Sequence, residues 1–131
     1  MFSITHIDHL VLTVKNIPIT LEFYARILGM YAIQFNGKDG TQRIALTFGS
    51  QKINLHESGK EFEPKAQTPT PGSVDLCLIT ETKLAQAMDY VRSCNVEIIE
   101  GPVERTGATG KLLSFYIRDP DQNLIEIANQ V

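Results

Sequence analysis

Hydrophobic and polar positions alternate with different periods along the chain, and each period predicts a secondary-structure element. Residues 7–14, "IDHLVLTV", are rich in Val, Leu and Ile and predict a strand. Pro18 suits the first turn of a following helix, with Asn16 or Ile17 near its cap, and Gly29 suits its C-terminal cap. The apolar stripe of that helix, at i, i+3, i+4 and i+7, consists of Leu21, Tyr24, Ala25 and Leu28.

Residues 31–57 predict three further strands. Turn signals occur at 36–40, which contain Asn-Gly and Asp-Gly, and again at 49–51. The first half of the chain is therefore predicted to have the order β-α-β-β-β. Residues 58–73 contain three of the six prolines and little apolar content, which indicates a linker or an ordered surface loop.

The second half of the chain repeats the same order. Residues 74–80, "VDLCLIT", predict a strand, residues 96–103 an extended segment, and residues 111–129 two strands joined by a turn at 119–122. The helical stripe between the first two consists of Leu84, Ala87, Met88 and Val91. The chain is therefore predicted to be one α+β domain, residues 1–131, built from two βαβββ modules, 1–57 and 74–131.

Composition narrows the class of protein. The chain is 43% apolar and 21% charged, its net charge is −3, and no basic run is present, which argues against a nucleic-acid or anionic-membrane surface. Cys77 and Cys94 match no metal-binding spacing, and Cys77 lies in an apolar run that predicts a small core residue. Neither a signal peptide nor a membrane span is indicated, so a soluble cytoplasmic protein is expected.

Overlaying the two halves aligns polar residues that lie in apolar strands. His9 falls on Asp75, an offset of 66 residues, and Asn54 falls on Glu126, an offset of 72. His56 lies two residues beyond Asn54 and shares its face of the strand. A buried group of this kind normally pairs with an opposite charge, binds a metal or stays neutral, because burying an unpaired charge costs several kcal/mol.

These positions can converge if the halves curl around a shared cleft. His, Asp and Glu suit a divalent ion such as Mn²⁺, Fe²⁺, Ni²⁺ or Zn²⁺, which polarises adjacent substrate oxygens as a Lewis acid. Simpler roles stay open: His9 as a core histidine bonded to a carbonyl, Asp75 as the group that orients it, and Glu126 as a paired buried acid. His56 is alternatively a solvated strand end.

The two ends of the chain carry a family resemblance. "IDHLVLTVKNIPITLEFYARILGM" resembles the opening of the vicinal oxygen chelate superfamily, which includes glyoxalase I, bleomycin-resistance proteins and extradiol dioxygenases, and "RDPDQNLIEI" resembles its closing motif. Stretches such as "INLHE" and "EGPVERTGATG" look closest to glyoxalase-domain-containing and virulence-associated proteins. The resemblance implies a cupped eight-stranded mixed sheet, a divalent metal inside the cup and a homodimer.

The resemblance also implies roles for single residues. His9 and Glu126 match the first-strand and last-strand metal ligands, and Glu126 is also the expected catalytic proton acceptor. Asp75 and Asn54 stand where many members have a histidine and a glutamate or glutamine. This subgroup therefore either uses a modified ligand set, with His9, His56, Asp75 and Glu126 as candidates, or has lost the metal. The expected substrate-binding residues are Asn54, Tyr116 and, in a glycine-rich loop, Arg105.

Two functions follow as hypotheses. The first is a metal-dependent lyase, isomerase or transferase of the glyoxalase type, acting on a small substrate with vicinal oxygens. The second is a metal-free binding protein that sequesters a small molecule, as bleomycin-resistance proteins do. An iron dioxygenase with a two-histidine, one-carboxylate set ranks below both because the second-module ligand is absent. Glyoxalase I itself is disfavoured by Asn54 and Asp75.

Overall fold

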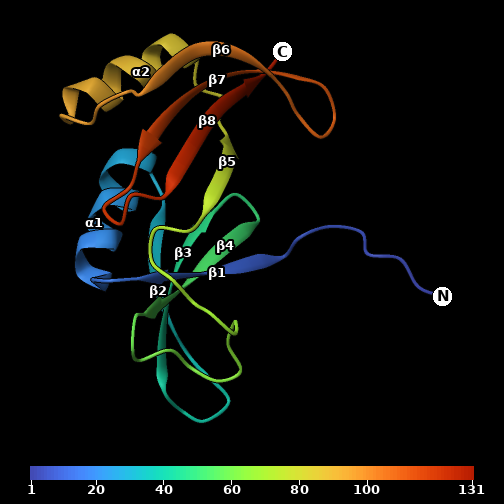
Figure 1. Ribbon diagram of the computed structural model, residues 1–131, viewed down its shortest axis with the longest axis vertical. Coiled ribbons are helices and arrows are strands. Elements are labelled where there is room, and N and C mark those ends of the chain that lie inside the picture. Colours follow the sequence, from blue (N-terminus) through green and yellow to red (C-terminus); the bar gives the residue numbers. More distant parts are fainter. The chain divides into compact units, whose positions relative to one another are not determined.

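The computed structural model describes all residues from 1 to 131, which form two compact units, Met1–Pro71 and Gly72–Val131 (Figure 1). Unit 1 contains β1 (His9–Val14), α1 (Ile17–Leu28), β2 (Tyr31–Asn36), β3 (Gln42–Phe48) and β4 (Gln51–Glu57). Unit 2 contains β5 (Asp75–Ile79), α2 (Leu84–Ser93), β6 (Glu100–Thr106), β7 (Lys111–Arg118) and β8 (Leu124–Gln130). The predicted α+β fold with two βαβββ modules and eight strands is confirmed.

The ends of α1 follow the predicted signals. The side chain of Asn16 accepts a hydrogen bond from the backbone N–H of Ile19, which satisfies one of the free donors of the first turn. Gly29 closes the helix with φ 68°, a left-handed conformation that glycine adopts without strain. The capping of α2 differs, because its cap residue Lys83 makes no side-chain hydrogen bond. Instead, Asn129 on β8 accepts a hydrogen bond from the N–H of Leu84.

The two sheets have the same topology. Strands are ordered β1-β4-β3-β2 in unit 1 and β5-β8-β7-β6 in unit 2, and the pairs β1–β4 and β5–β8 are parallel while the others are antiparallel. The register is also the same, since Val11 lies opposite Asn54 and Cys77 lies opposite Glu126. The overlay of the two halves on sequence therefore matches their strand pairing.

Alternation along the strands gives each sheet two different faces. In unit 1 the apolar face carries side chains that are at most 2% exposed, among them Leu12, Leu46, Ile53 and Leu55, and α1 packs against this sheet. In unit 2, Phe115, Ile117 and Ile125 are fully buried, and α2 packs against β7. The opposite faces carry the candidate polar residues, and we call them the polar face of unit 1 and the polar face of unit 2.

Two segments differ from the expectations. The strand expected from Val96 begins only at Glu100, and it continues to Thr106, so that Arg105 lies on β6 and the predicted glycine-rich loop shrinks to residues 107–110. Pairing of Arg105 with Leu112 on β7 extends the strand through this position.

Residues 58–73 contain no helix or strand. Neither helix is long and apolar enough to cross a membrane.

Candidate functional site

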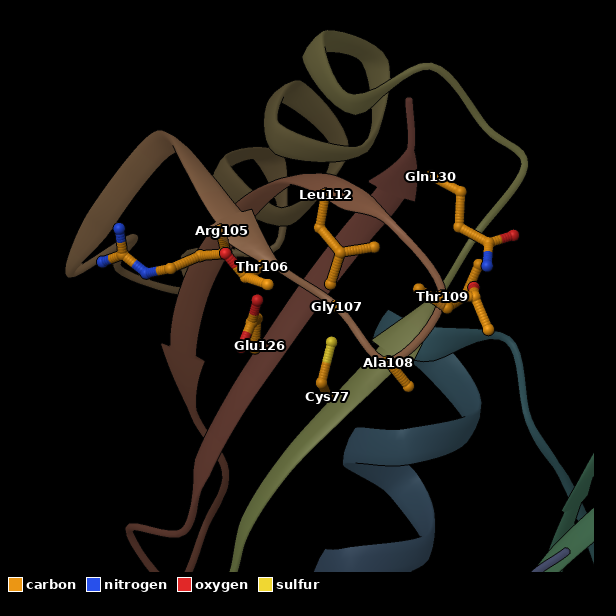
Figure 2. A pocket seen from close by; sticks show the side chains of 10 residues that line it. Cys77, Arg105, Thr106, Gly107, Ala108, Thr109, Leu112, Glu126 and Gln130 are labelled. Carbon is orange, nitrogen blue, oxygen red and sulfur yellow. The ribbon is translucent and has the colours of Figure 1, made fainter.

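A cavity of about 410 Å³ lies on the polar face of unit 2 (Figure 2). The connection between β6 and β7 passes over it, while β5 and β8 supply its floor. Both polar and apolar side chains face this space, which is open to solvent on one side. Its lining residues are Cys77, Ile79, Arg105, Thr106, Gly107, Ala108, Thr109, Leu112, Glu126 and Gln130.

Glu126 is the carboxylate of this cavity. Its Oε2 accepts a hydrogen bond of 2.7 Å from Oγ of Ser114, a fully buried residue on β7. Tyr116 lies directly opposite Glu126 in the β7–β8 pair. Burial raises the pKa of Tyr116, the Glu126 charge raises it further, and Arg105 lowers it. A carboxylate oriented in this way in a cavity can accept or return a proton.

Arg105 is fixed on the same face rather than carried by a loop. Its Nε donates a hydrogen bond of 2.9 Å to the Tyr116 hydroxyl, and one terminal nitrogen lies 3.1 Å from a carboxylate oxygen of Glu100. Its other terminal nitrogen donates to the backbone oxygen of Glu104. These contacts orient the guanidinium toward Tyr116, so Arg105 acts on the cavity partly through that phenol.

Cys77 is a residue of the cavity wall that the sequence analysis did not predict. The expectation of a small core residue is wrong, because Cys77 is exposed and lines the cavity opposite Glu126. Strand alternation explains this, since Cys77 shares the face of Asp75 and not that of Leu76 and Leu78. Although the residue is exposed, its thiol is partly buried in the cavity wall. This partial burial, then the charge and hydrogen bond of Glu126, raise the pKa of Cys77 to about 11.

Asp75 begins β5 and is exposed, opposite Leu124. It lies diagonally to Glu126 across the parallel pair, so the two carboxylates share the polar face of unit 2. The charge of Asp75 also contributes to the raised pKa of Cys77. His9 and Asn54 have the same diagonal relationship in unit 1, because His9 lies opposite Lys52.

His9 is oriented by a carboxylate. Its Nδ1 lies 2.8 Å from Oδ2 of Asp8, and 41% of its side chain is exposed. The hydrogen bond from His9 is the main reason that the pKa of Asp8 is lowered. Because this contact uses Nδ1, Nε2 keeps its capacity to bind a ligand, as in metal sites where a carboxylate orients the histidine.

Two buried atoms on β4 have no hydrogen-bond partner, namely Oδ1 of Asn54 and Nδ1 of His56. His56 is 7% exposed, and its ring meets that of Phe62 edge-on at 5.5 Å between centroids. Burial, then the nearby charge of Arg43, lowers the pKa of His56. The expectation of a solvated strand end is therefore wrong for His56, because residues 58–73 fold back over it through Phe62.

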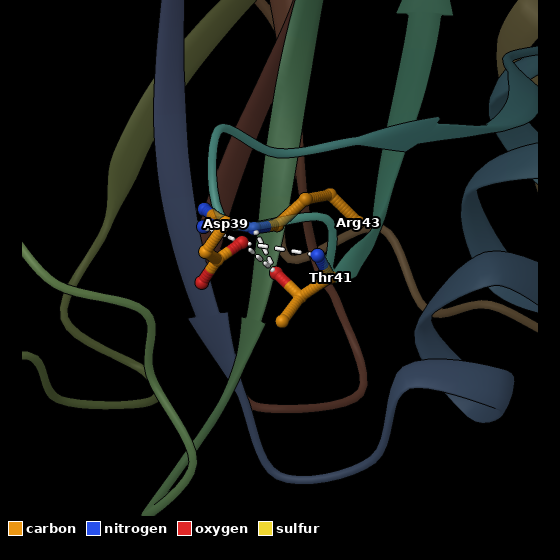
Figure 3. Close-up of polar contacts among 3 residues, drawn as sticks. All are labelled: Asp39, Thr41 and Arg43. Carbon is orange, nitrogen blue, oxygen red and sulfur yellow. Dashed lines mark hydrogen bonds and ion pairs between the residues drawn. The ribbon is translucent and has the colours of Figure 1, made fainter.

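Arg43 is held in place beside this histidine. The turn residues Asp39 and Thr41 fix it, since Thr41 accepts a hydrogen bond from the Arg43 Nε and Asp39 lies 3.5 Å from its terminal nitrogen (Figure 3). The guanidinium lies 3.8 Å from the centroid of the Phe62 ring. A stacked cation of this kind keeps its charge and loses little conformational freedom on binding an anion.

The register separates the two histidines of unit 1. Thr13, and not His9, lies opposite His56. His9 and His56 are therefore offset by four positions along the strand pair, which corresponds to about 13 Å along the strand direction. His56 therefore belongs with Arg43 and Phe62, whereas His9 belongs with Asn54.

In neither unit do three or more His, Cys, Asp or Glu side chains form a group that could hold a metal ion. The chemistry of single donors still suits a divalent ion, since an imidazole nitrogen such as Nε2 of His9, which Asp8 leaves uncontacted, and a carboxylate such as Glu126 are ligand types that such ions take.

Comparison with known proteins identifies the family. The model of the Glyoxalase/Bleomycin resistance protein/Dioxygenase superfamily matches residues 6–127. The chain belongs to this superfamily. Virulence protein STM3117 of Salmonella typhimurium is 55% identical over 98% of this chain and 86% of its own length, and glyoxalase domain-containing protein RDO1 of Mycosarcoma maydis is 51% identical over 97% and 69%.

Solved structures of this superfamily show the same fold. An integron cassette protein from the mobile metagenome of V. Cholerae has a TM-score of 0.94 and 57% identity, covering 100% of this chain and 99% of that one. Two distant structures share the fold alone. The antibiotic binding protein TnmS3 of Streptomyces has a TM-score of 0.76 at 18% identity and full coverage of both chains. Lactoylglutathione lyase of Agrobacterium tumefaciens has 0.70 at 17%, covering 97% and 95%.

Proposed function

We propose that this glyoxalase-superfamily protein binds a small molecule with vicinal oxygen atoms and transforms it by lyase, isomerase or transferase chemistry. The observation that carries the proposal is the position of Glu126, a carboxylate that faces a cavity and is oriented by Ser114. Ser114 fixes one carboxylate oxygen, and Cys77 and Tyr116 also lie within hydrogen-bonding reach of this carboxylate. Held in this way, Glu126 accepts a proton from the carbon next to a substrate oxygen and returns it.

Other residues of the cavity support this role. Tyr116, whose hydroxyl is fixed by Arg105, presents a phenol on the same face as Glu126. Apolar side chains such as Ile79 and Leu112 line the cavity beside Glu126 and offer a contact surface to the apolar part of a substrate. The Cys77 thiol is protonated at neutral pH because its pKa is about 11, so it serves as a wall of the cavity and not as a nucleophile.

A divalent ion completes the proposal. Asp75 and Glu126, which share the polar face of unit 2, are the candidate ligands there, and His9, with its ring oriented by Asp8, is a separate candidate ligand in unit 1. Such an ion supplies Lewis-acid stabilisation of negative charge on the substrate oxygens. His56 is left out of this set because it lies four positions from His9 along the strand pair, and because its neighbours are Phe62 and the charge of Arg43.

Metal binding and proton transfer can be tested separately. Titration of the chelator-treated protein with Ni²⁺, Mn²⁺, Zn²⁺ and Fe²⁺ should show binding that His9→Ala and Glu126→Gln weaken. His6→Ala is the matched control, since His6 bonds only to Thr5 before β1 begins. Equal affinities in all variants would refute the metal assignment. Proton transfer is tested by the exchange of substrate protons for solvent deuterium. NMR of a panel of α-hydroxyketones should show this exchange with the parent protein and not with Glu126→Gln.

The second candidate function is sequestration of a small molecule without chemistry. It is favoured by Asn54 and Asp75, which stand where many members of the superfamily have a glutamate or glutamine and a histidine, respectively. An antibiotic binding protein shares the fold. This function predicts that a bound compound raises the melting temperature equally with and without a chelator. It also predicts that the parent protein, like Glu126→Gln, promotes no deuterium exchange in any compound of the panel.

A further inference from the structure

The segment before β1, residues 1–8, is an exposed apolar arm. It contains no helix or strand, and Met1, Phe2, Ile4 and Ile7 are each at least 67% exposed. Single exposed apolar residues are normal on a protein surface, but four within seven positions mark a segment that interacts with something. The arm leads away from the sheet of unit 1 (Figure 1). Phe2 and Ile4 are two residues apart, so in an extended segment their side chains lie on one side.

The arm is anchored at its end nearest to β1. Gln51, the first residue of β4, donates a hydrogen bond of 3.3 Å from its Nε2 to the backbone oxygen of Ile7. Farther out, Oγ1 of Thr5 lies 2.8 Å from Nδ1 of its own neighbour His6. Residues 1–6 therefore extend in front of a fixed point, with Phe2 and Ile4 in solvent.

The matching feature of the fold is the free edge of β2. This strand ends the order β1-β4-β3-β2, so one side of its backbone has no strand partner. Its sequence, "YAIQFN", contains no charge and no proline, and its register with β3 is regular. Charges, prolines and bulges are the devices by which edge strands avoid pairing with another chain, and β2 has none of them. All of its residues except Phe35 are exposed, Tyr31 at 75%.

The other three sheet edges are less suited to accept a strand. β6 contains Pro102 and three charged residues, and its pairing with β7 is interrupted by a register shift. β5 has only five residues and begins with the charge of Asp75. β1 is buried from Leu12 to Val14, so its side chains are already covered there. An extended apolar segment therefore fits β2 best.

The arm is too short to pair with β2 of its own chain. β1 and β2 are the opposite edges of a four-stranded sheet, about 14 Å apart at the usual spacing between strands. Crossing that distance takes about four of the six residues before Ile7, at roughly 3.3 Å per residue, and leaves too few to form a strand. A second copy of the chain has no such limit. The contact can also be reciprocal, since each copy carries one arm and one free edge.

We propose that residues 2–6 of one copy add as a strand to the free edge of β2 in a second copy, so that two chains exchange their arms. Backbone hydrogen bonds supply the pairing, and Phe2 and Ile4 lie beside Tyr31. Phe2 and Tyr31 of both copies together cover on the order of 600 Å², about half of a small specific interface, and the arm backbones and Ile4 add to this area. The inference does not rest on the chemistry proposed for Glu126.

Self-association is the first test. Sedimentation of the parent should give twice the 14.6 kDa of one chain, with a dissociation constant of about 1 µM or below. Phe2→Asp, Ile4→Asp and Tyr31→Lys should each weaken the dimer about tenfold or more, because each places a charge in the paired edge. Ile19→Asp is the matched control. Ile19 is 55% exposed on α1, so this variant should leave the affinity unchanged.

Two further measurements assign the contact to the arm and β2. Amide hydrogen exchange of β2 should slow as the protein concentration rises, and Phe2→Asp should remove this dependence. Cross-linking uses a protein whose two native cysteines are replaced by serine. A short bismaleimide should then link Ser3→Cys of one copy to Ala32→Cys of another, giving a product with the mass of two chains. The control pair, Ser3→Cys with Ile19→Cys, should give no such product.

Three results would overturn the proposal. The first is a parent protein that is monomeric. The second is a dimer whose affinity neither Phe2→Asp nor Ile4→Asp changes, since the two copies would then meet through another surface. The third is cross-linking at Ile19→Cys that is as efficient as cross-linking at Ala32→Cys, because the arm would then have no preferred strand.

Discussion

Ser114 and Glu126 form a hydrogen bond of 2.7 Å between a fully buried hydroxyl and the carboxylate that faces the unit 2 cavity. The two residues lie on neighbouring strands, β7 and β8, one step diagonal to each other, because Ser114 is paired with Ala128. The donor therefore lies at a fixed position in the sheet, and it orients the Glu126 carboxylate in the cavity without a change in the backbone.

This bond should be measurable as a coupling energy. A double-mutant cycle of Ser114→Ala and Glu126→Ala, followed by urea unfolding, is expected to give about 1–2 kcal/mol, since hydrogen bonds to charged groups are the stronger ones. Thr41 and Asp39 form the matched exposed pair, also a hydroxyl donating to a carboxylate, and should give a smaller coupling because solvent competes there. Equal coupling in both pairs would contradict the proposed role of burial.

Titration of Tyr116 should report on both of its neighbours. Its pKa is raised by burial and by the charge of Glu126, and it is lowered by the hydrogen bond and charge of Arg105. Arg105→Met should therefore raise the Tyr116 pKa further, and Glu126→Gln should lower it. Tyrosine resonances labelled with ¹³C measure these shifts, with Tyr116→Phe to assign the signal. Shifts in the same direction in both variants would show that the two neighbours do not act as described.

Alkylation of Cys77 should depend strongly on pH. Because its pKa is about 11, the thiolate fraction at pH 8 is small, and the rate of reaction with iodoacetamide should rise about tenfold per pH unit up to pH 10. Cys94→Ser leaves Cys77 as the single thiol for this measurement. Adding Glu126→Gln should speed the reaction at pH 8, because the charge that opposes the thiolate is gone. A plateau in rate below pH 9 would refute the assignment.

The turn between β7 and β8 carries a strained residue that can be relieved. Gln122 has φ 72°, where a side chain is disfavoured. It is the last residue of the turn, and its N–H donates a hydrogen bond to the backbone oxygen of Asp119. Gln122→Gly should therefore stabilise the protein by up to about 1 kcal/mol, because the gain in the turn is partly offset by a more flexible unfolded chain. Thermal or urea unfolding measures the change. A loss of stability would mean that the Gln122 side chain contributes contacts that exceed the strain.

Local signals were sufficient to predict most of the fold. Asn16, Pro18 and Gly29 mark the two ends of α1 because capping and turn chemistry act within a few residues. The start of β6 was missed because residues 96–98 have strand-like composition but no partner on β7, whereas Ile99 donates a hydrogen bond to Tyr116 and the paired register begins at Glu100. Composition alone does not show which apolar segment finds a pairing partner.

The site was only partly accessible to sequence reasoning. Overlaying the halves found Glu126 and Asp75, and alternation from Asp75 would also have found Cys77 on their face. Ser114 carried no signal, because its hydroxyl matters only through a strand that lies beside β8 in space. The same limit applies to His56, since its contact with Phe62 depends on how residues 58–73 fold back. The roles predicted for all of these site residues stay predictions, namely those of His9, Asn54, His56, Asp75, Arg105, Tyr116 and Glu126.

The equal register of the two parallel pairs has a consequence for how this protein diverges. Each module presents one diagonal pair of positions, and the pairs are chemically unlike: a histidine and an amide in unit 1, two carboxylates in unit 2. A substitution in one module changes the charge on its own face while the strand geometry of its counterpart is preserved. The two diagonal pairs can therefore be changed one at a time, so the ligand chemistry of the unit 1 face can change while unit 2 keeps its carboxylates.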